Sequence, residues 1–254
     1  MILAVDVGNT QTVLGLITQG ELDGHWRVST DASLTADELR IKIGGLLAAE
    51  GRSWSDVERL IVSSVVPSLT VAYEEVARRS TGKSPMVVGP GLKTGMVIRY
   101  DNPHEVGADR IVNGVAAFQL FGGPVIVVDF GTATTMDVIS GDGAYLGGAI
   151  APGVETSAEA LFSRAARLTS VDLEPPERVI GTNTRASLQA GLLIGEAARI
   201  DGLVRRAWAE LGRETRVVAT GGLAPLMAPL CEAITDVDVD LTLRGLAMIY
   251  ALNA

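Results

Sequence analysis

An acidic turn that occurs twice constrains the fold of this chain more than any other feature. Asp6-Val7-Gly8-Asn9-Thr10 follows the apolar run Ile2–Val5, and Asp129-Phe130-Gly131-Thr132-Ala133-Thr134-Thr135 follows the apolar run Val125–Val128. At an offset of 123 residues (129 − 6), the copies share the identical pairs Val5/Val128, Asp6/Asp129, Gly8/Gly131 and Thr12/Thr135. A strand–Asp–x–Gly turn is common when it occurs once, but internal repetition reports architecture. The repeat therefore predicts two related domains, residues 1–113 and 114–254.

The composition of each turn favours nucleotide binding. Glycine lets the backbone turn sharply after a buried strand, so that amide and hydroxyl donors can gather around an anion. Two such turns are together suited to the phosphates of a nucleotide and to its metal ion. Because carboxylate and water are the ligands that Mg²⁺ prefers, we expect Asp6 to lie beside that cation.

Strands and helices alternate after an initial meander in each half, which is typical of an α/β fold with mixed sheets covered by helices. Thr35 and Glu38 have the spacing of a capping box, and apolar residues from Leu39 to Leu47 then share a helical face until Gly51. The expected strands are Ile2–Val5, Val13–Ile17, His25–Val28, Leu60–Val66, Met86–Val88, Val125–Val128, Met136–Ile139, Tyr145–Ile150 and Arg216–Ala219. The expected helices, besides the capped one, are Ser68–Arg79, Arg110–Phe121, Glu155–Leu168, Arg185–Leu211 and Leu241–Leu252.

Charge and residue usage exclude several classes of function. The chain has 254 residues, with 21 Lys and Arg against 30 Asp and Glu, and the basic residues are scattered, so a nucleic-acid partner is not expected. Its only histidines are His25 and His104, which leaves too few for most zinc sites and for histidine-based triads. Catalysis must therefore rely on carboxylates, hydroxyls and a hard metal ion.

Targeting features favour the cytoplasm. Every long apolar stretch is interrupted by charge or glycine before the roughly 18 residues that a membrane span needs, so we expect no membrane association. The amino terminus runs straight into a strand and lacks the pattern of a secretory signal. The single cysteine, Cys231, permits no disulfide within the chain and fits a reducing compartment.

A second informative segment is Asn102-Pro103-His104-Glu105-Val106-Gly107-Ala108-Asp109-Arg110. Its Asp and Arg lie at the expected start of a helix, where backbone amides attract anions. An arginine that matches a carboxylate, beside an aspartate that accepts a proton, supplies both halves of a kinase acceptor site. The alternative is structural: Asp109 is then the N-cap of the helix and Arg110 a solvated charge.

These motifs together resemble known families. The two acidic turns are similar to the phosphate loops of the actin, sugar kinase and Hsp70 superfamily, whose duplicated actin-like (ribonuclease H-like) domains hold ATP. The whole ordered set resembles the type III pantothenate kinases, over nearly the entire chain and without a missing motif. The motifs are Asp6–Thr10, Gly89–Gly95, Tyr100, Asn102-Pro103, Val106–Arg110, Asp129–Thr135, Tyr145–Gly153, Gly181–Thr184 and Ala219–Gly222.

The resemblance implies residues for ATP and its metal ions. The first turn would bind the phosphates through Asp6, Val7, Gly8, Asn9, Thr10, Gln11, Thr12 and Val13. Asp6 would organise Mg²⁺ through water, and Thr132 would contact the nucleotide from the second turn. Gly221 and Gly222 match the turn that contacts adenosine. Asp129 would help to hold the monovalent cation, K⁺ or NH₄⁺, that the family requires.

The resemblance also implies a site for pantothenate. Tyr100, Gly107, Ala108, Asp109 and Arg110 would bind this substrate, with Arg110 on its carboxylate and Asp109 as the general base for its hydroxyl. Thr184 would close the site, which in this family is built at a homodimer interface.

Several of these residues have structural alternatives. Thr184 is equally suited to be the N-cap of the long helix that follows it. Gly221 and Gly222 are also what the end of a strand requires, and Gly147-Gly148 fits a tight β bend. The three tryptophans, Trp26, Trp54 and Trp208, are interpreted as packing residues.

The sequence thus predicts an ATP-dependent kinase that converts pantothenate to 4'-phosphopantothenate, the first step towards coenzyme A. The alternatives are a kinase for another small hydroxy acid, a non-catalytic regulatory relative, and a nucleotide-dependent assembly or chaperone protein of the same superfamily. The last class has larger inserted subdomains than 254 residues permit. A regulatory relative would be expected to have lost Asp6 or Asp109, and both are present.

Overall fold

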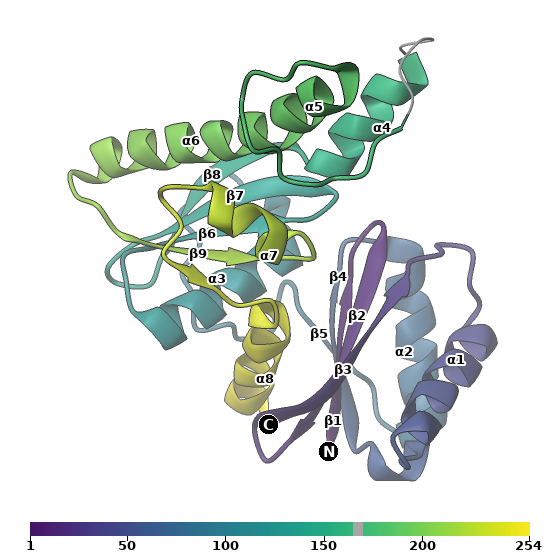
Figure 1. Ribbon diagram of the computed structural model, residues 1–254. Helices are drawn as coiled ribbons and strands as arrows, with labels where there is room; N and C mark the ends of the chain where they lie inside the picture. The colour runs from purple at the N-terminus through teal and green to yellow at the C-terminus, as the bar shows by residue number, and fades with distance from the viewer. Residues whose placement is uncertain (165–169) are drawn as a thin grey trace. The chain divides into compact units, whose positions relative to one another are not determined.

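The computed structural model describes residues 1–164 and 170–254. They form two compact units, Met1–Ala116 with Leu241–Ala254, and Ala117–Asp240, and each contains a five-stranded mixed sheet (Figure 1). The expected ranges, 1–113 and 114–254, differ from these units chiefly at the carboxyl end, because Leu241–Ala254 was expected in the second domain but belongs to the first unit. The difference arises because the last helix packs its apolar side chains on the first sheet.

The first sheet is built around a strand that is buried on both faces. In spatial order its strands are β3 (Glu21–Ser29), β2 (Gln11–Thr18), β1 (Ile2–Val7), β4 (Arg59–Ser64) and β5 (Met86–Val87). β1 pairs antiparallel with β2 and parallel with β4. Its continuous apolar run suits a central position, whereas β3 alternates exposed and half-buried residues, as an edge strand does.

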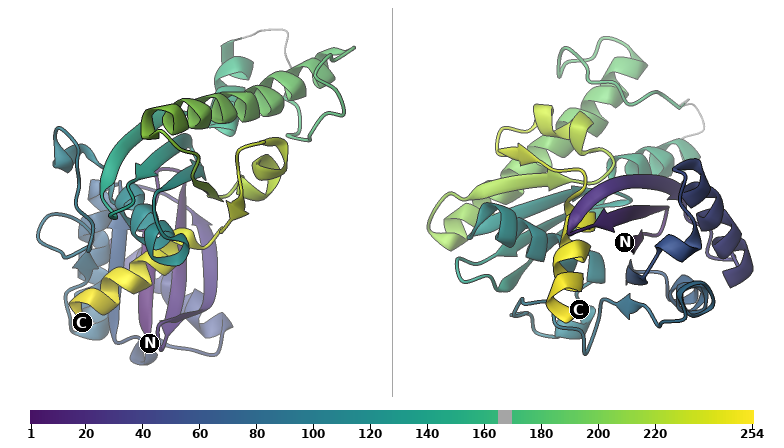
Figure 2. Two further views of the ribbon diagram at one scale, coloured as in Figure 1. Left: turned by 90° about the vertical axis from the view of Figure 1, so that its left-hand side faces the viewer. Right: turned by 90° about the horizontal axis from the view of Figure 1, so that it is seen from below.

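Helices cover both faces of this sheet. On one face lie α1 (Ala36–Ala49) and α2 (Pro67–Thr81), and on the other α3 (Ala108–Phe121) and α8 (Leu241–Asn253). Figure 2 shows α8 lying across the strands of this sheet. The predicted capping box of α1 is confirmed: the Thr35 hydroxyl accepts from the Glu38 amide at 3.3 Å, and the Glu38 carboxylate accepts from the Thr35 amide at 2.9 Å.

The second sheet repeats the strand order of the first. Its strands, in the corresponding order, are β8 (Tyr145–Pro152), β7 (Ala133–Ile139), β6 (Val125–Phe130), β9 (Arg216–Thr220) and β10 (Asp236–Val237). β6 pairs antiparallel with β7 and parallel with β9, as β1 does with β2 and β4. The duplication inferred from the two turns is therefore present in the topology of the sheets.

Helices of the second unit pack on one face of its sheet. They are α4 (Val154–Arg164), α5 (Thr184–Gln189), the π-helical turn η3 (Ala190–Ile194), α6 (Gly195–Leu211) and α7 (Ala224–Met227). The helix expected over Glu155–Leu168 is described as far as Arg164, and its last positions, 165–168, lie outside the described residues. The helix expected over Arg185–Leu211 is present, but η3 interrupts its regular geometry. Three short 3₁₀ turns complete the elements: η1 (Trp54–Asp56), η2 (Pro103–Glu105) and η4 (Ala228–Leu230).

The two turns differ in length, which a fixed offset does not reveal. Asp6 pairs with Val13 across the first hairpin, whereas Asp129 pairs with Thr135 across the second. The second turn is therefore one residue shorter. The residue that corresponds in space to Thr12 is Thr134, and both are buried.

The packing of α8 on α3 generates a prediction about two helical glycines. A Cβ added at Gly245 would lie 2.3 Å from the Val112 carbonyl oxygen, whereas a Cβ at Gly202 in α6 meets nothing within 4 Å. We expect Gly202→Ala to raise the free energy of unfolding by about 0.5–1 kcal/mol. Gly245→Ala should lower it by about 1–3 kcal/mol, since overpacking forces the two helices apart. Thermal melts of the two variants test this, and equal stabilisation by both would contradict the close approach of α8 to α3.

Candidate active site

The first acidic turn is fixed by bonds to the end of β3. The Gly8 amide donates to the Gln11 carbonyl at 3.0 Å, and the Thr30 amide donates to the Thr10 carbonyl at 2.9 Å. The hydroxyls of Thr12 and Thr30 are hydrogen-bonded at 2.8 Å. A Cβ at Gly8 would lie 2.9 Å from the Gln11 carbonyl oxygen, so the turn requires glycine there. These bonds hold the segment from Asp6 to Val13 in one shape.

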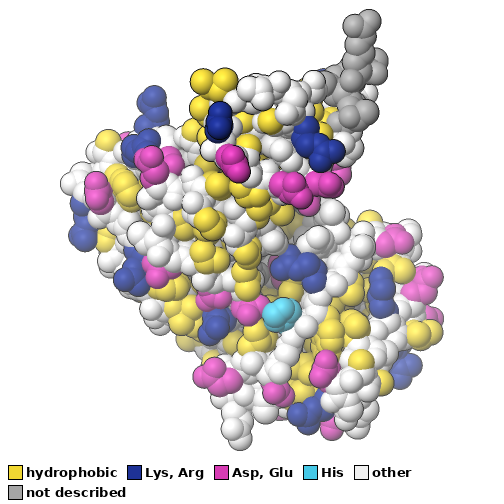
Figure 3. Space-filling model, in the orientation of Figure 1, with side chains coloured by type: hydrophobic (Ala, Val, Ile, Leu, Met, Phe, Trp, Pro, Cys, Tyr) yellow, Lys and Arg dark blue, Asp and Glu magenta, His cyan; other side chains and the backbone are white. Residues whose placement is uncertain are grey.

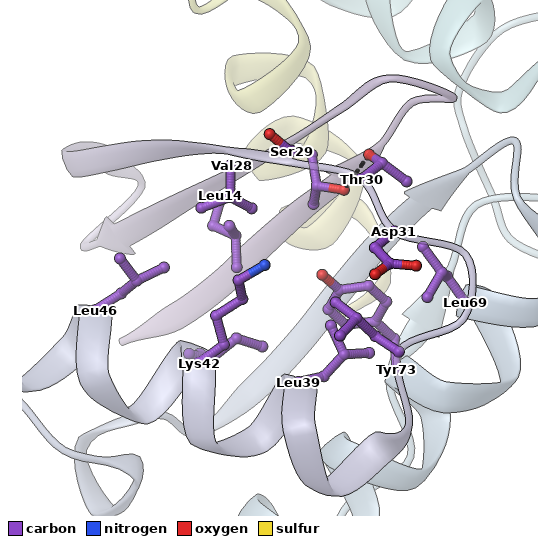
Figure 4. A pocket seen from close by; sticks show the side chains of 13 residues that line it. Leu14, Val28, Ser29, Thr30, Asp31, Leu39, Lys42, Leu46, Leu69 and Tyr73 are labelled. Carbon is purple, nitrogen blue, oxygen red and sulfur yellow. Dashed lines mark hydrogen bonds between the residues drawn. The ribbon is translucent and has the colours of Figure 1, made fainter.

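A small pocket lies behind this turn, between β2, β3, α1 and α2. Thr30, Asp31, Lys42 and Tyr73 contribute polar groups to it, and Leu14, Leu39 and Leu69 contribute apolar ones (Figure 4). Burial raises the pKa of the Tyr73 hydroxyl. The pocket volume of about 10 Å³ is room for roughly one water molecule, so this pocket is not a nucleotide site.

The second turn is held in the same way. The Gly131 amide donates to the Ala133 carbonyl at 3.2 Å. The Thr132 carbonyl accepts the Gly153 amide at 3.0 Å, as the Thr10 carbonyl accepts the Thr30 amide. The Thr156 hydroxyl adds a further bond to the Thr132 carbonyl, at 2.7 Å. The start of α4 therefore fixes the second turn.

Gly221 lies against the Asp129 carboxylate. It follows β9 with φ of +91°, and an added Cβ would lie 2.3 Å from Asp129 Oδ1 and 2.7 Å from the Phe130 carbonyl oxygen. The structure therefore brings Gly221 and Asp129 together at the second turn, whereas Gly222 is exposed. The positive φ and this close contact both require glycine at position 221, independently of any ligand contact.

Each acidic turn has a buried hydroxyl beside its aspartate. Ser63 pairs in register with Asp6 on the neighbouring parallel strand, and Thr220 pairs with Asp129. Both side chains are buried, and no described residue gives either hydroxyl a hydrogen-bond partner. An unsatisfied buried hydroxyl costs about 1–3 kcal/mol. The Ser63 and Thr220 hydroxyls lie at equivalent positions, each beside a carboxylate. Their oxygen atoms are suited to bind a cation or its bound water.

The segment that leads into α3 is locally ordered. The Asn102 side chain accepts from the His104 amide at 3.2 Å and donates to Glu105 at 2.8 Å. Asp109 Oδ1 accepts the Arg110 amide at 2.8 Å, and a Cβ at Gly107 would lie 2.4 Å from that oxygen. Gly107 therefore leaves the space that the Asp109 carboxylate occupies.

The structural alternatives for Asp109 and Arg110 are wrong. Because α3 begins at Ala108, Asp109 is its second residue rather than its N-cap. Arg110 is only 6% exposed, so it is not a solvated helix charge. Burial raises the pKa of Asp109 above its ordinary value of 3.8, and this effect outweighs the Arg110 amide and the Arg110 charge, which lower it. A half-buried carboxylate of raised pKa beside an arginine is suited to accept a proton.

Two further residues predicted to bind pantothenate, Tyr100 and Thr184, lie outside the Gly107–Arg110 segment. Tyr100 is partly exposed in the loop before η2. Thr184 is the first residue of α5 and is exposed in an open depression that residues 181–184, 187 and 188 line. The N-cap is Asn183, whose side chain accepts the Ala186 amide at 2.9 Å, so Thr184 as N-cap is wrong.

Gly147 and Gly148 lie within β8, where Gly147 has a φ of +124° opposite the register shift between Val138 and Ile139, so the predicted β bend is present inside the strand. A Cβ at Gly148 would lie 1.7 Å from the Met136 carbonyl oxygen on the neighbouring strand. Glycine is needed here because β7 and β8 approach closely, beside the register shift between Val138 and Ile139.

The sequence did not single out the residues that support the turns. Thr30 and Thr156 carry no motif that marks them. Ser63 has a visible signal, because hydroxyls at 63 and 64 interrupt the apolar run that begins at Leu60. Thr220 lies within the motif Ala219–Gly222, but no role was predicted for its hydroxyl.

Side-chain charge is mixed on the face that Figure 3 shows, where Lys and Arg lie in small groups with acidic side chains between them. Among residues 1–164 and 170–254, no helix has the length and apolar character that crossing a membrane requires. Within the same described ranges, no three His, Cys, Asp or Glu side chains are grouped so as to hold a metal ion. A metal ion here would need ligands beyond clustered carboxylates.

The whole chain is similar in sequence to one family of kinases. The model of the type III pantothenate kinase family matches residues 2–206. The chain is 51% identical over 253 residues to the type III pantothenate kinase of Moorella thermoacetica, covering 100% of both chains. It is 49% identical over 254 residues to the type III pantothenate kinase of Bacillus cytotoxicus, covering 100% of this chain and 97% of that one.

Solved structures share the fold at low sequence identity. A Campylobacter jejuni protein named for the Baf family of transcriptional activators matches with a TM-score of 0.65 and 20% identity, over 99% of this chain and 98% of that one. The polyphosphate/ATP-glucomannokinase of an Arthrobacter species matches with a TM-score of 0.52 and 15% identity, over 100% and 99%. These likenesses concern the fold alone, and they confirm the predicted α/β architecture of duplicated actin-like units.

The contact between Gly221 and Asp129 generates a prediction with a matched control. Gly212 also has a positive φ, +69°, but an added Cβ there meets nothing within 4 Å. Gly212→Ala should cost about 1 kcal/mol of stability from backbone strain alone and leave kcat unchanged. Gly221→Ala should cost more and should reduce kcat, because its Cβ displaces the Asp129 carboxylate. If thermal melts and kinetics find the two variants alike, Gly221 does not position Asp129.

Proposed function

Because the chain belongs to the type III pantothenate kinase family, it phosphorylates pantothenate with ATP in coenzyme A biosynthesis, and we propose that Asp109 is the general base. The observation that carries this proposal is the half-buried Asp109 carboxylate, for which Gly107 leaves space and whose pKa is raised by desolvation. When ionised it accepts the proton of the pantothenate hydroxyl as that oxygen attacks the terminal phosphate of ATP. Gly107 and Ala108 complete the backbone around this carboxylate.

The acceptor is recognised through its carboxylate. A guanidinium presents two parallel donors that match a carboxylate, and burial of Arg110 strengthens such a contact. Tyr100 contacts the same substrate from the preceding loop. Thr184 closes the site from a second copy of the chain, so the enzyme is a homodimer. The exposed apolar side chains of Val179 (66%) and Ile180 (77%), close to Thr184 in sequence, support an assembly surface.

ATP is held mainly by the two turns. The amides and hydroxyls from Asp6 to Val13 bind its phosphates, and their fixed shape supports this assignment because preorganised donors need no rearrangement. Thr132 contacts the nucleotide from the second turn, and Gly221 with Gly222 contacts adenosine. The enzyme works in the cytoplasm, where ATP is available.

As a kinase, the enzyme uses a divalent metal ion, and we infer that the ion is Mg²⁺. One carboxylate, with waters and substrate phosphates, is the usual protein share of such a site, and Asp6 beside the Ser63 hydroxyl fits it. When bound, Mg²⁺ neutralises charge on the phosphates. Asp129 and the Thr220 hydroxyl fit a monovalent cation, K⁺ or NH₄⁺, because both supply oxygen ligands.

A direct assay tests the function. Purified enzyme should convert pantothenate and ATP to a phosphorylated product and ADP in equal amounts, and related hydroxy acids without the pantothenate structure should not replace it. ADP release that does not depend on pantothenate would contradict the proposed acceptor.

Asp109→Asn tests the general base. Asn keeps the shape but cannot accept the proton, so kcat should fall by about 10²–10⁴-fold. The thermal midpoint should be no lower than that of the wild type, because burial disfavours the ionised carboxylate that is removed. Steady-state kinetics and thermal melts measure both, and a kcat within about threefold of wild type would exclude Asp109 as the base.

The pH dependence of kcat/KM gives an independent check. Because the pKa of Asp109 is raised, its proton leaves only as the pH rises above the ordinary value of 3.8. Wild-type kcat/KM should therefore increase with pH through that raised pKa, since the ionised form is active. The residual activity of Asp109→Asn should lack this acidic limb. An unchanged limb in the variant would assign it to another group.

Arg110→Lys tests recognition of the acceptor. The change keeps the charge but loses the planar pair of donors. We expect a higher KM for pantothenate, equivalent to about 1.5–3 kcal/mol, with little change in KM for ATP. Arg213→Lys, at an exposed position beyond α6, is the control and should change neither. Equal effects of Arg110→Lys on both substrates would show that Arg110 does not read the carboxylate.

A further inference from the structure

A partly buried ion pair lies near the start of α6 in the second unit. Glu196 is 6% exposed, and the Arg199 side chain is 33% exposed. The residues are three apart on one helix face, and Arg199 Nη2 contacts Glu196 Oε2. Nothing in the proposed reaction uses either side chain.

Stability does not explain why this pair is present. The free energy needed to remove two charges from water can exceed the free energy of their attraction. A protein with apolar residues of similar volume in their place is often at least as stable. The hydrogen-bonding capacity of this pair is also not fully used, because no described residue bonds Glu196 Oε1 or Arg199 Nε. A partly buried pair that leaves Glu196 Oε1 and Arg199 Nε unbonded is better explained by the geometry that it imposes on its neighbours.

That geometry leads to the second turn. Arg199 Nη2 also donates to the Pro152 carbonyl at 2.8 Å. Pro152 ends β8, and the amide of the next residue, Gly153, donates to the Thr132 carbonyl at 3.0 Å. A Cβ at Gly153 would lie 2.2 Å from the Gly131 carbonyl oxygen, so this corner and the turn are in tight contact. Movement of the corner would therefore move the turn.

The π-helical turn η3 sets the direction of Arg199. A π turn adds one residue to a helical repeat, and one residue corresponds to about 100° of rotation around a helix. Regular α-helix over 190–194 would turn Glu196 and Arg199 away from their present face relative to α5. π turns occur frequently at functional sites, which is consistent with a role for the residues that follow this one.

We propose that Arg199, held by Glu196, is a positioning residue for the nucleotide turn at Thr132. It fixes the Pro152 carbonyl, and through Gly153 it sets the place of the Thr132 backbone. This inference rests on the proposed contact of Thr132 with ATP. Loss of the Arg199 bond should weaken ATP binding while leaving pantothenate binding and the chemical step largely intact.

Arg199→Lys in the full-length enzyme is the main test. Lysine keeps the charge beside Glu196 but has no planar fork to bond both Glu196 and the Pro152 carbonyl. KM for ATP should rise about tenfold, which corresponds to about 1.4 kcal/mol, with KM for pantothenate unchanged. The double variant Glu196→Gln/Arg199→Met, which leaves no unpaired buried charge, should show the same change and guards against a folding defect.

Arg205→Met is the matched control. Arg205 lies on the same helix and pairs with Glu232, but their side chains are 55% and 80% exposed. This variant should keep wild-type kinetics. An Arg199→Lys enzyme whose thermal midpoint falls while its KM for ATP is unchanged would overturn the inference. So would an equal rise in KM for both substrates, which indicates general distortion.

Thr132→Val separates this inference from the proposed function. If KM for ATP rises in Thr132→Val and in Arg199→Lys, the positioning role is supported. If it rises in Thr132→Val alone, the turn binds ATP but Arg199 does not position it. If it rises in neither, the proposed contact of Thr132 with ATP fails, and the positioning role fails with it.

Discussion

In each unit, one backbone hydrogen bond ties the carbonyl of the acidic turn to the residue that follows the third strand of the meander. The Thr30 amide bonds the Thr10 carbonyl in the first unit, and the Gly153 amide bonds the Thr132 carbonyl in the second. Each bond ties a turn to the end of the third strand of its meander, which fixes the direction of the amides. We propose that these amides bind phosphate, and a site of fixed amides gains its strength from preorganisation rather than from added charge. This suits a chain whose net charge is −9.

Glycines leave space for two partly buried carboxylates. Gly107 leaves space for the Asp109 carboxylate, and Gly221 does so for the Asp129 carboxylate. Burial raises the pKa of Asp109, which makes it a better proton acceptor at neutral pH. In phosphoryl transfer the protein mainly positions groups and neutralises charge, so these placements are the greater part of the mechanism.

Local patterns predicted much of the fold, since apolar runs, the capping box at Thr35 and the repeated turn all act over a few residues. Features that depend on tertiary packing could not be predicted from these local patterns. The register of the second hairpin depends on a turn one residue shorter, so Thr134 rather than Thr135 corresponds to Thr12. The π turn η3 and the two-residue strand β10 are set by tertiary packing, not by periodicity. The family motifs indicated the segment that we propose to be catalytic, but the hydroxyls beside Asp6 and Asp129 become apparent only from strand pairing.

We propose that the two copies of the duplicated strand and turn serve two different cations, Mg²⁺ at Asp6 and K⁺ at Asp129. The most direct measurement is the dependence of activity on Mg²⁺ and on K⁺ for Asp6→Asn and for Asp129→Asn, at saturating ATP and pantothenate. Asp6→Asn should raise the Mg²⁺ concentration for half-maximal activity and leave that for K⁺ unchanged. Asp129→Asn should do the reverse. If both variants shift the same cation, or if neither shifts any, the two turns do not divide the cations between them.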